Sequence, residues 1–398
     1  MQISDRLGPL GGGVFARTDQ RKQIYRQAPE SQGRPPLIDL SLGSSDLRPP
    51  QQVLDAMAEA LQDPGSSAYC LNAGTAPFQD AVAAWCSQRF GVDIDPGSQV
   101  QLLVGSQEGT AHLPLAVLNP GDPALVLDPC YPSHLGGLVL AGADVQTLAL
   151  SSTDGWTPDL TAVSESNWDR LKLFVFGYPH NPTARVGDQG VLDAVMQRGI
   201  NHDLVIAHDN PYVDLSLAGD APSLLRSPGW RERGIEFFSL SKGWCMGGIR
   251  LGFAVGAAPL IAALRQVKSV IDFNQSLALQ RGGITALSEY SDWPAGLRPV
   301  YRDRRDQVSA ALRGKGWSVP TAEMALYLWL PIPDWAQALG WDDERCAAEL
   351  LDQCGVALTP GSGFGEGGRG WLRMALVRPV DVLLEAVDRL GGCGERFV

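Results

Sequence analysis

Lysine chemistry has few possible places in this chain, because only five of its 398 residues are lysine. Lys242 is the most suggestive of them, in the segment FFSLSKGWCMGGIRLGF, just beyond a strand predicted to end at Leu240. Ligands of α/β proteins bind at such strand ends, and a lysine amine can form an imine with an aldehyde cofactor. Arg250, after the glycine-rich stretch, offers a fork of donors suited to phosphate. The alternative is that Lys242 is an ordinary exposed turn residue.

Three other segments carry polar residues directly after a predicted strand. FVFGYPHNPTAR places Asn181 between prolines, although alone this could be a simple Asn-Pro turn. LVIAHDNPYVDL places Asp209 after an apolar strand with Tyr212 three residues on, although an isolated Asp209 could be a helix N-cap. GSQEG (105–109) lies between a strand and a helix, a geometry that binds phosphate but is a weak signal by itself.

Together the four segments are more informative, because the carboxyl ends of parallel strands share one edge of a sheet. They would bring together an imine-forming amine, an acceptor for a protonated ring nitrogen, donors for a phenolate oxygen and a phosphate cradle. Pyridoxal 5′-phosphate uses this set of groups, and no other common cofactor needs all of it. The residues therefore predict a site for that cofactor.

The elements that would hold these segments alternate between short apolar runs and helical patterns. Runs that are apolar on both faces are typical of strands in a sheet covered by helices on both sides. Strands are predicted at 100–104, 124–127, 171–176, 204–208, 236–240 and 251–255, and a helix at 107–118. This pattern predicts an α/β fold with a mostly parallel central sheet between helices.

Beyond Pro259 the pattern changes to helices at 260–271, 300–312, 344–354 and 380–390 and strands at 325–330 and 371–377. This mixture predicts a second, smaller α+β domain. The proline- and glycine-rich segment before Val53 is typical of a strap between domains. We therefore expect an N-terminal strap that is part of the small domain (1–50), a large cofactor-binding α/β domain (51–285) and a small C-terminal α+β domain (286–398).

Composition argues against several other classes of protein. The net charge of −12 disfavours binding to nucleic acid or to an anionic membrane, and no apolar run approaches the ~18–20 residues of a membrane span. Seven cysteines without a CxxC pair, and a start (MQISDRLGPLGGG) without the pattern of a secretory signal, favour a cytoplasmic protein. The five histidines include no HExxH or HxH motif, so no metal site is predicted.

On these motifs the sequence resembles the class I/II aminotransferases, which are pyridoxal-phosphate-dependent enzymes of fold type I. It is most similar to the subgroup of LL-diaminopimelate, aspartate and alanine aminotransferases. GSQEG, DPCYP, NPTA, DNPY, SLSK followed by GIRLG, and LRMAL occur in family order between about Leu37 and Leu390. The spacing of Asn181, Asp209 and Tyr212 also agrees with the family.

The resemblance implies a role for each matching residue. Lys242 would hold the cofactor as a covalent imine, and would then move a proton between the substrate's Cα and the cofactor's C4′ as general base and acid. Asp209 would pair with the ring nitrogen, Asn181 and Tyr212 would hydrogen-bond the phenolic O3′ oxygen, and Tyr131 would stack on the ring. The phosphate would be held by Ser106, Gln107, Ser239 and Arg250, with Ser241 as a lesser candidate.

The resemblance also implies how substrate binds. Arg373 would clamp the α-carboxylate with a bidentate pair, although an arginine on an apolar strand could instead form a buried structural ion pair. Asn181 would contact substrate as well, and Gly43 in the strap would line that side with backbone. Tyr69 matches the tyrosine that reaches the phosphate of the neighbouring subunit, which implies a homodimer with shared active sites. His180 is expected to be a turn or wall residue and not a catalyst, since lysine already moves the proton.

The resulting prediction is an aminotransferase that moves an amino group between an L-amino acid and a 2-oxo acid, by a ping-pong cycle through pyridoxamine phosphate. A C–S β-lyase or other eliminating enzyme on the same fold is the alternative, because the cofactor residues cannot separate the two. The sequence departs from the family at Phe78-Gln79 and in GWCMGGI after Lys242, so the substrate is left open. Side chains that could meet a charged substrate side chain are Arg17, Arg34, Arg48, Glu108 and Glu323.

Overall fold

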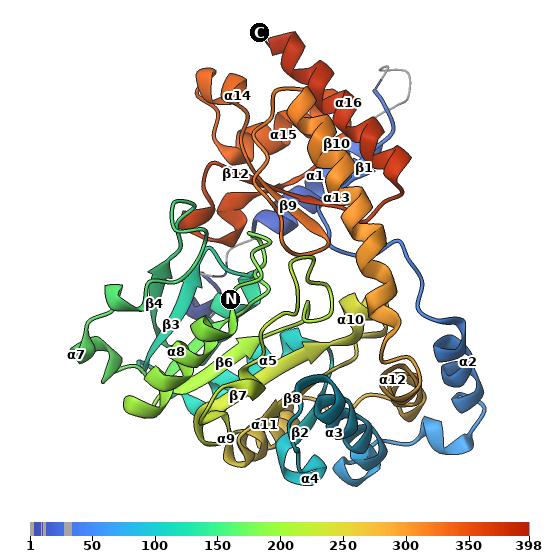
Figure 1. Cartoon of the computed structure of the whole chain (residues 1–398), viewed down its shortest axis with the longest axis vertical. Coiled ribbons are helices and arrows are strands. Elements are labelled where there is room, and N and C mark those ends of the chain that lie inside the picture. Colours follow the sequence, from blue (N-terminus) through green and yellow to red (C-terminus); the bar gives the residue numbers. More distant parts are fainter. Residues whose placement is uncertain (1–3, 9, 11–12, 28–33, 398) are drawn as a thin grey trace.

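The computed structural model describes residues 4–8, 10, 13–27 and 34–397. Among these residues, a seven-stranded sheet with its helices forms the lower part of the view in Figure 1, and a smaller group of helices and short strands lies above it. The strand order is β2-β8-β7-β6-β5-β3-β4. The strands are β2 (Val100–Leu103), β3 (Pro123–Asp128), β4 (Asp144–Ala149), β5 (Leu173–Phe176), β6 (Val205–Asp209), β7 (Gly234–Ser239) and β8 (Gly252–Gly256).

The large sheet is mostly parallel, as predicted, with one reversed strand. Within the described residues, β8 alone runs against the others, since it pairs antiparallel with both β7 and β2. The reversal matters for the site, because β8 begins at the edge where its neighbours end. It therefore brings Arg250, which precedes β8, to the same edge as Lys242, which follows β7.

The apolar runs form strands because both of their faces are covered. Every residue of β5 (LFVF) is buried, and so is every residue of β7 before Ser239, which requires helices on both sides of the sheet. The strand β4 was not predicted from the sequence. It lies at the sheet edge and buries only Leu148, so its apolar residues give no strand-like pattern.

The helices of the large sheet include two that approach unusually closely. A Cβ atom on Gly137 of α6 would lie 2.4 Å from the backbone oxygen of Thr110 in α5, so only glycine allows this approach. Helix α5 starts directly after β2 and therefore holds GSQEG at the sheet edge. The longer helices around the sheet are α2 (Gln51–Ala60), α3 (Ala76–Phe90), α5 (Ser106–Val117), α6 (Pro132–Ala141), α8 (Gln189–Asn201), α11 (Ala258–Ile271) and α12 (Leu277–Ser288).

The upper part contains a small antiparallel sheet and a two-stranded parallel pair. The sheet has the order β11-β12-β9, formed by Thr359–Pro360, Trp371–Ala375 and Tyr327–Pro331. The pair joins β1 (Ile38–Asp39) to β10 (Val356–Ala357), so the strap pairs with the C-terminal part of the chain. The helices here are α1 (Val14–Gln27), α13 (Leu297–Gly314), α14 (Asp334–Ala338), α15 (Asp343–Cys354) and α16 (Val380–Phe397) (Figure 1).

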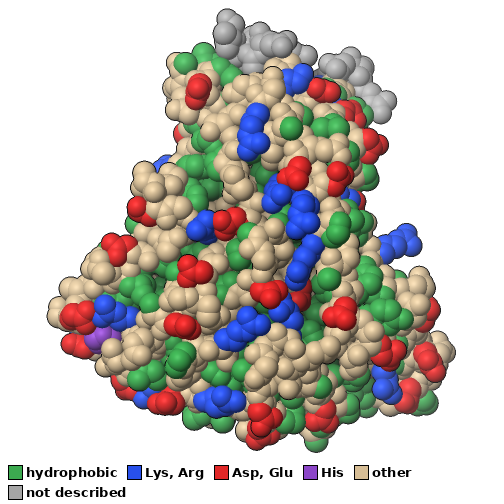
Figure 2. All heavy atoms as spheres, viewed as in Figure 1, with side chains coloured by type: hydrophobic (Ala, Val, Ile, Leu, Met, Phe, Trp, Pro, Cys, Tyr) green, Lys and Arg blue, Asp and Glu red, His purple; other side chains and the backbone are tan. Residues whose placement is uncertain are grey.

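The surface seen in Figure 2 carries lysine and arginine side chains interspersed with aspartate and glutamate. One ion pair on the described chain joins Arg305 of α13 to its neighbour Asp306. Among the described helices, none combines the length and the apolar character that crossing a bilayer would require.

Candidate active site

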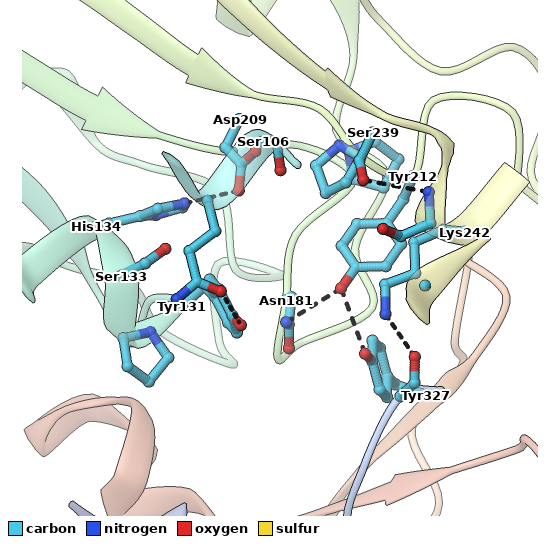
Figure 3. A pocket seen from close by; sticks show the side chains of 18 of the residues that line it. Ser106, Tyr131, Ser133, His134, Asn181, Asp209, Tyr212, Ser239, Lys242 and Tyr327 are labelled. Atoms are coloured by element: carbon cyan, nitrogen blue, oxygen red, sulfur yellow. Dashed lines mark hydrogen bonds and ion pairs between the residues drawn. The ribbon is translucent and has the colours of Figure 1, made fainter. Parts of the chain in front are cut away.

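A cavity of about 450 Å³ lies between the edge of the large sheet and the small antiparallel sheet (Figure 3). Its walls come from both parts of the molecule. Asp209 ends a strand of the large sheet and Lys242 follows another, whereas Tyr327 and Arg373 belong to β9 and β12. Most residues singled out in the sequence line it: Gly43, Ser106, Gln107, Tyr131, Asn181, Asp209, Tyr212, Ser239, Ser241, Lys242, Arg250 and Arg373.

Of the five lysines, all within the described residues, only Lys242 lines this cavity. Lys22 is buried against Asp39, and Lys172 is exposed on the way into β5. Lys268 and Lys315 form ion pairs elsewhere, with Glu108 and Asp388 respectively. Any imine chemistry in the cavity therefore has a single candidate amine.

The amine of Lys242 is directed by the strap. Helix α10 (Leu240–Gly243) follows β7 and carries Lys242, whose Nζ donates a hydrogen bond to the backbone oxygen of Gly43. A Cβ atom on Gly43 would lie 1.8 Å from the hydroxyl of Tyr327, so the packing requires glycine at this position. Gly43 thus brings backbone close to both side chains and lines the cavity.

Asp209 is the last residue of β6, and its buried carboxylate faces the cavity. Its Oδ2 lies 3.0 Å from Nε2 of His134, while its Oδ1 has no hydrogen-bond partner among the described residues. A buried carboxylate oxygen without a partner is costly, so this atom fits the protonated ring nitrogen of the predicted cofactor. His134 was missed in the sequence because nothing in its own segment, the start of α6, links it to Asp209.

A row of hydrogen bonds crosses the cavity floor. Asn181 Nδ2 donates to the Tyr212 hydroxyl over 3.2 Å, and that hydroxyl lies 3.3 Å from the hydroxyl of Tyr327. Burial raises the pKa of Tyr212, so its hydroxyl keeps its proton and can donate it to a phenolic oxygen. Tyr327 was missed in the sequence, since in the run ALYLWL it reads as a core strand residue.

Arg373 is buried, yet it has no ion pair with a carboxylate among the described residues. Its Nη1 donates to Asn181 Oδ1 over 2.8 Å and its Nη2 to the backbone oxygen of Ser41 over 2.9 Å, while its Nε has no partner in the described chain. The rings of Tyr327 and Phe364 lie 4.3 Å and 4.8 Å from its Cζ. The structural ion pair considered from the sequence is therefore absent from the described residues, and the charge can meet a substrate carboxylate.

The start of α5 forms a cradle for an anion. Gly105 has φ +78°, and a Cβ atom there would lie 2.7 Å from Nη2 of Arg250, so glycine lets the guanidinium approach the loop. The hydroxyl of Ser241 is buried without a partner among the described residues. An orphaned hydroxyl, a guanidinium and a helix N-terminus at one end of the cavity fit the phosphate of the predicted cofactor.

This cradle is held from behind by Glu108. Its carboxylate accepts a hydrogen bond from the backbone N–H of Val104 and bonds Lys268 Nζ over 2.7 Å. His112 and Asp272 complete a cluster of potential metal ligands around Glu108, but the ammonium of Lys268 lies among them, 2.9 Å from Asp272. Glu108 therefore anchors the loop and does not face the cavity.

His180 lines the cavity wall, and burial, with the nearby His134, lowers its pKa to about 3.

Tyr69 does not line this cavity and is 83% exposed, with its ring 5.2 Å from that of Phe273. The candidates for contact with a charged substrate side chain also lie outside the lining: Arg17, Arg34, Arg48, Glu108 and Glu323. Glu323, for example, pairs with Arg185.

Comparison with known proteins agrees with this geometry. The family model for aminotransferase class I and II matches residues 35–390. An LL-diaminopimelate aminotransferase of Moorella thermoacetica is 36% identical over 391 residues, 98% of each chain. A solved structure titled probable N-succinyldiaminopimelate aminotransferase, from Thermus thermophilus, is 42% identical with a TM-score of 0.88, over 96% of this chain and 100% of that one.

An aspartate aminotransferase of Thermus thermophilus, solved as a mutant, has a TM-score of 0.89 at 26% identity, over 99% of this chain and 100% of that one. These relatives are all named aminotransferases, which favours transamination over the elimination that the sequence left open. Class I and II aminotransferases depend on pyridoxal 5′-phosphate and act on amino acids and 2-oxo acids. With its family shown over nearly the whole chain, this protein belongs to the class I and II aminotransferases and is a pyridoxal-phosphate-dependent transaminase of fold type I.

Proposed function

We propose that this enzyme holds pyridoxal 5′-phosphate through a covalent bond to Lys242 and transfers an amino group between an L-amino acid and a 2-oxo acid. The observation that carries the proposal is the cavity itself. Among the described residues, the cavity contains a single lysine, Asp209 Oδ1 has no hydrogen-bond partner, and Arg373 pairs with no carboxylate. The protonated ring of the cofactor would be the missing partner of Asp209, and the carboxylate of the substrate would be that of Arg373.

The residues that would hold the cofactor surround this lysine. Asp209 would pair with the ring nitrogen, Asn181 and Tyr212 would donate to the phenolic oxygen, and Tyr131 would cover one face of the ring. When bound, the cofactor supplies an electron-withdrawing ring that weakens the bonds at the substrate's Cα. The phosphate would be held by Ser106, Gln107, Ser239, Ser241 and Arg250.

The remaining steps belong to the protein's own side chains. Arg373 would bind the substrate α-carboxylate through two parallel hydrogen bonds, with Asn181 and the backbone at Gly43 beside it. The free amine of Lys242 would take the proton from the substrate's Cα as a general base and return it as a general acid.

We also propose a homodimer in which Tyr69 reaches the cofactor phosphate of the other subunit. Three observations support this proposal. Tyr69 is highly exposed and lies outside the cavity of its own chain. Exposed apolar residues also lie close in sequence to Tyr69 and to Phe273, whose ring contacts that of Tyr69. Exposed apolar side chains of this kind mark interaction surfaces. They include Leu71, Val270 and Ile271.

The division of the chain remains part of the proposal: a strap (1–50) belonging to the small domain, a large domain (51–285) and a small C-terminal domain (286–398). The pairing of β1 with β10 supports the assignment of the strap. We further assign the enzyme to the cytoplasm; the seven cysteines form no disulfide among the described residues, which supports a reducing compartment.

The test is the position of the covalent bond. Borohydride reduction of the purified enzyme, followed by peptide mapping, should place the cofactor on Lys242. Lys242→Ala should lose both the bound-cofactor absorption and transamination, whereas Lys172→Ala, an exposed lysine outside the cavity, should keep both. A label on another lysine would overturn the assignment, and release of ammonia and pyruvate from a cysteine conjugate without a 2-oxo acid would favour the lyase.

A further inference from the structure

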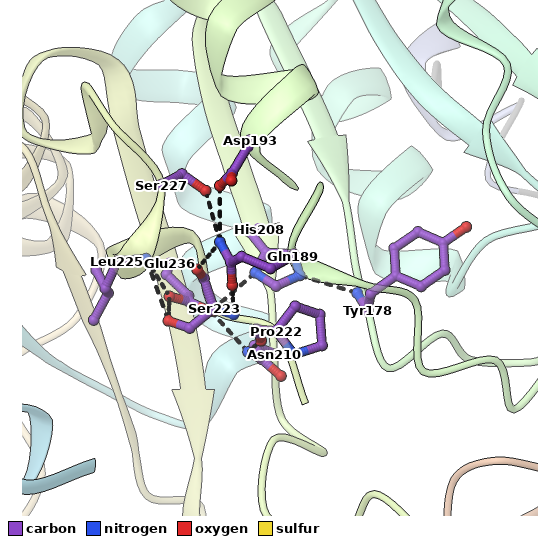
Figure 4. A network of polar contacts seen from close by, with 10 residues as sticks. All are labelled: Tyr178, Gln189, Asp193, His208, Asn210, Pro222, Ser223, Leu225, Ser227 and Glu236. Carbon is purple, nitrogen blue, oxygen red and sulfur yellow. Dashed lines mark hydrogen bonds and ion pairs between the residues drawn. The ribbon is translucent and has the colours of Figure 1, made fainter. Parts of the chain in front are cut away.

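Behind the active site, the carboxylate of Glu236 is completely buried on β7. It accepts four hydrogen bonds: from His208 Nδ1 at 2.9 Å, Asn210 Nδ2 at 2.7 Å, the Ser223 hydroxyl at 2.7 Å and the backbone N–H of Leu225 at 3.2 Å (Figure 4). No lysine or arginine among the described residues pairs with it. Burying a carboxylate without a cation costs free energy unless hydrogen bonds satisfy its oxygens, so the four donors are needed to hold Glu236 in this place.

The hydrogen-bond partners of His208 determine where its proton lies. The backbone N–H of Tyr178 can only donate, and it lies 3.0 Å from Nε2 of His208, so Nε2 must accept. The ring is therefore neutral with its proton on Nδ1, which donates to Glu236. The ring also packs against the ring of Phe176 in a tilted arrangement, with the two centroids 4.8 Å apart. Glu236 thus selects one tautomer of His208, the one that can receive the Tyr178 N–H.

The hydrogen bonds from Tyr178 to His208 and from His208 and Asn210 to Glu236, which we call the Glu236–His208 relay, connect at both ends to segments that carry cavity-lining residues. His208 and Asn210 flank Asp209, and because neighbouring side chains of a strand point to opposite faces, holding them behind the sheet directs Asp209 into the cavity. Tyr178 opens the turn that carries Asn181 three residues later. One buried carboxylate is thereby linked to the two segments that carry Asp209 and Asn181, both of which line the cavity.

We propose that Glu236 and His208 are positioning residues of the transaminase: Glu236 orients His208 and Asn210, and His208 in turn fixes the turn that presents Asn181. The inference rests on the proposed roles of Asp209 and Asn181. Neither Glu236 nor His208 lines the cavity, so neither is a catalytic residue. With the other tautomer, a ring N–H would face the Tyr178 N–H and push the turn away.

Two substitutions at His208 separate its two contacts. The amide oxygen of His208→Gln reaches the place of Nε2 and can still accept from Tyr178 N–H, whereas the amide nitrogen of His208→Asn takes the place of Nδ1 and can donate to Glu236 only. Each variant loses one buried hydrogen bond, so both should lose similar stability. Gln79→Leu is a matched control, because it removes a buried amide that bonds only the backbone oxygen of Val100, away from the cavity.

The readouts are the dissociation constant of the cofactor and the pH midpoint of its absorption band, which reports hydrogen bonding to the phenolic oxygen. His208→Asn should weaken cofactor binding about tenfold and shift the midpoint, because a buried N–H loses its acceptor. His208→Gln should stay within about threefold of the wild type with an unchanged midpoint. Equal effects of the two variants, or a loss of melting temperature alone in His208→Asn, would overturn the proposal.

A measurement on the unmodified protein covers the case in which the variants do not fold. With only five histidines in the chain, long-range ¹H–¹⁵N spectra of histidine-labelled enzyme can resolve each ring. They should show one buried histidine in the neutral Nδ1–H form that changes when Glu236 is replaced by Gln. A charged or Nε2–H ring at His208 would refute the relay whether or not the cofactor is attached to Lys242, whereas labelling at another lysine would count only against the proposed function.

Discussion

The guanidinium of Arg373 on β12 donates to the side-chain oxygen of Asn181, in the turn after β5, over 2.8 Å. The same Asn181 donates through its nitrogen to Tyr212. A cation from the small sheet and a hydroxyl at the edge of the large sheet are therefore joined through one amide. If Arg373 binds substrate and Tyr212 the cofactor, as proposed, Asn181 links the two contacts directly.

Replacing Arg373 should separate substrate binding from cofactor binding. In Arg373→Lys, the ammonium cannot clamp a carboxylate with two parallel bonds and still donate to Asn181. We expect kcat/KM for the amino donor to fall by about 100-fold, mostly through KM, from the loss of roughly 2–3 kcal/mol of charge-assisted bonding. Arg378→Lys is the control, since Arg378 bonds only the backbone of Val377. Unchanged KM in Arg373→Lys would remove this residue from the substrate site.

Gly43 should tolerate no side chain. In Gly43→Ala the new methyl group would collide with the Tyr327 ring, whose hydroxyl and Cζ would lie at 1.8 Å and 2.6 Å, and would displace the oxygen that receives Lys242. Steady-state kinetics should show a fall of about tenfold or more in kcat/KM. Gly248→Ala, close to Arg250 but with open space around its Cα, should behave like the wild type. Equal activity of the two variants would contradict this packing.

Shared active sites can be tested with mixed dimers. Tyr69→Ala should weaken cofactor binding and Lys242→Ala should be inactive. A heterodimer of the two contains one site with both native residues. Co-expressed and mixed chains should therefore exceed the average activity of the two parents, approaching about a quarter of the wild type in a 1:1 mixture. Activity equal to the average would place Tyr69 outside the partner's site.

His180 should make stability depend on pH. Its pKa is about 3 in the folded chain, against an ordinary value of 6.5, because burial disfavours the charged ring. Between those values the unfolded chain binds a proton that the folded chain does not, so the free energy of unfolding falls as the pH drops below 6.5, by up to about 1.4 kcal/mol per pH unit. Urea unfolding at several pH values should show a shallower dependence for His180→Asn. Parallel curves for the two proteins would contradict a buried neutral His180.

Much of the fold and the candidate site could be predicted because the signals lie in short windows. Apolar runs such as LFVF, each followed by a polar turn, predicted strands with site residues just beyond their ends. Those strands form in the central sheet. The edge strand β4 escaped prediction because it buries only Leu148. Glu108 and Glu323 were candidates for substrate contact by residue type, but their partners, Lys268 and Arg185, hold them away from the cavity.

The order of residues along the chain was enough to single out Lys242, Asp209, the turn at Asn181 and the loop at 105–109 as site candidates, because each signal depends on its immediate neighbours, and the structure brings all four to one cavity. Contacts between distant segments were decided only by packing. His134 meets Asp209 across 75 positions, Tyr327 closes on Gly43, and the reversed β8 delivers Arg250 to the edge where its neighbours end. No local pattern encodes such pairs, since each arises only when two separate apolar surfaces are buried against each other.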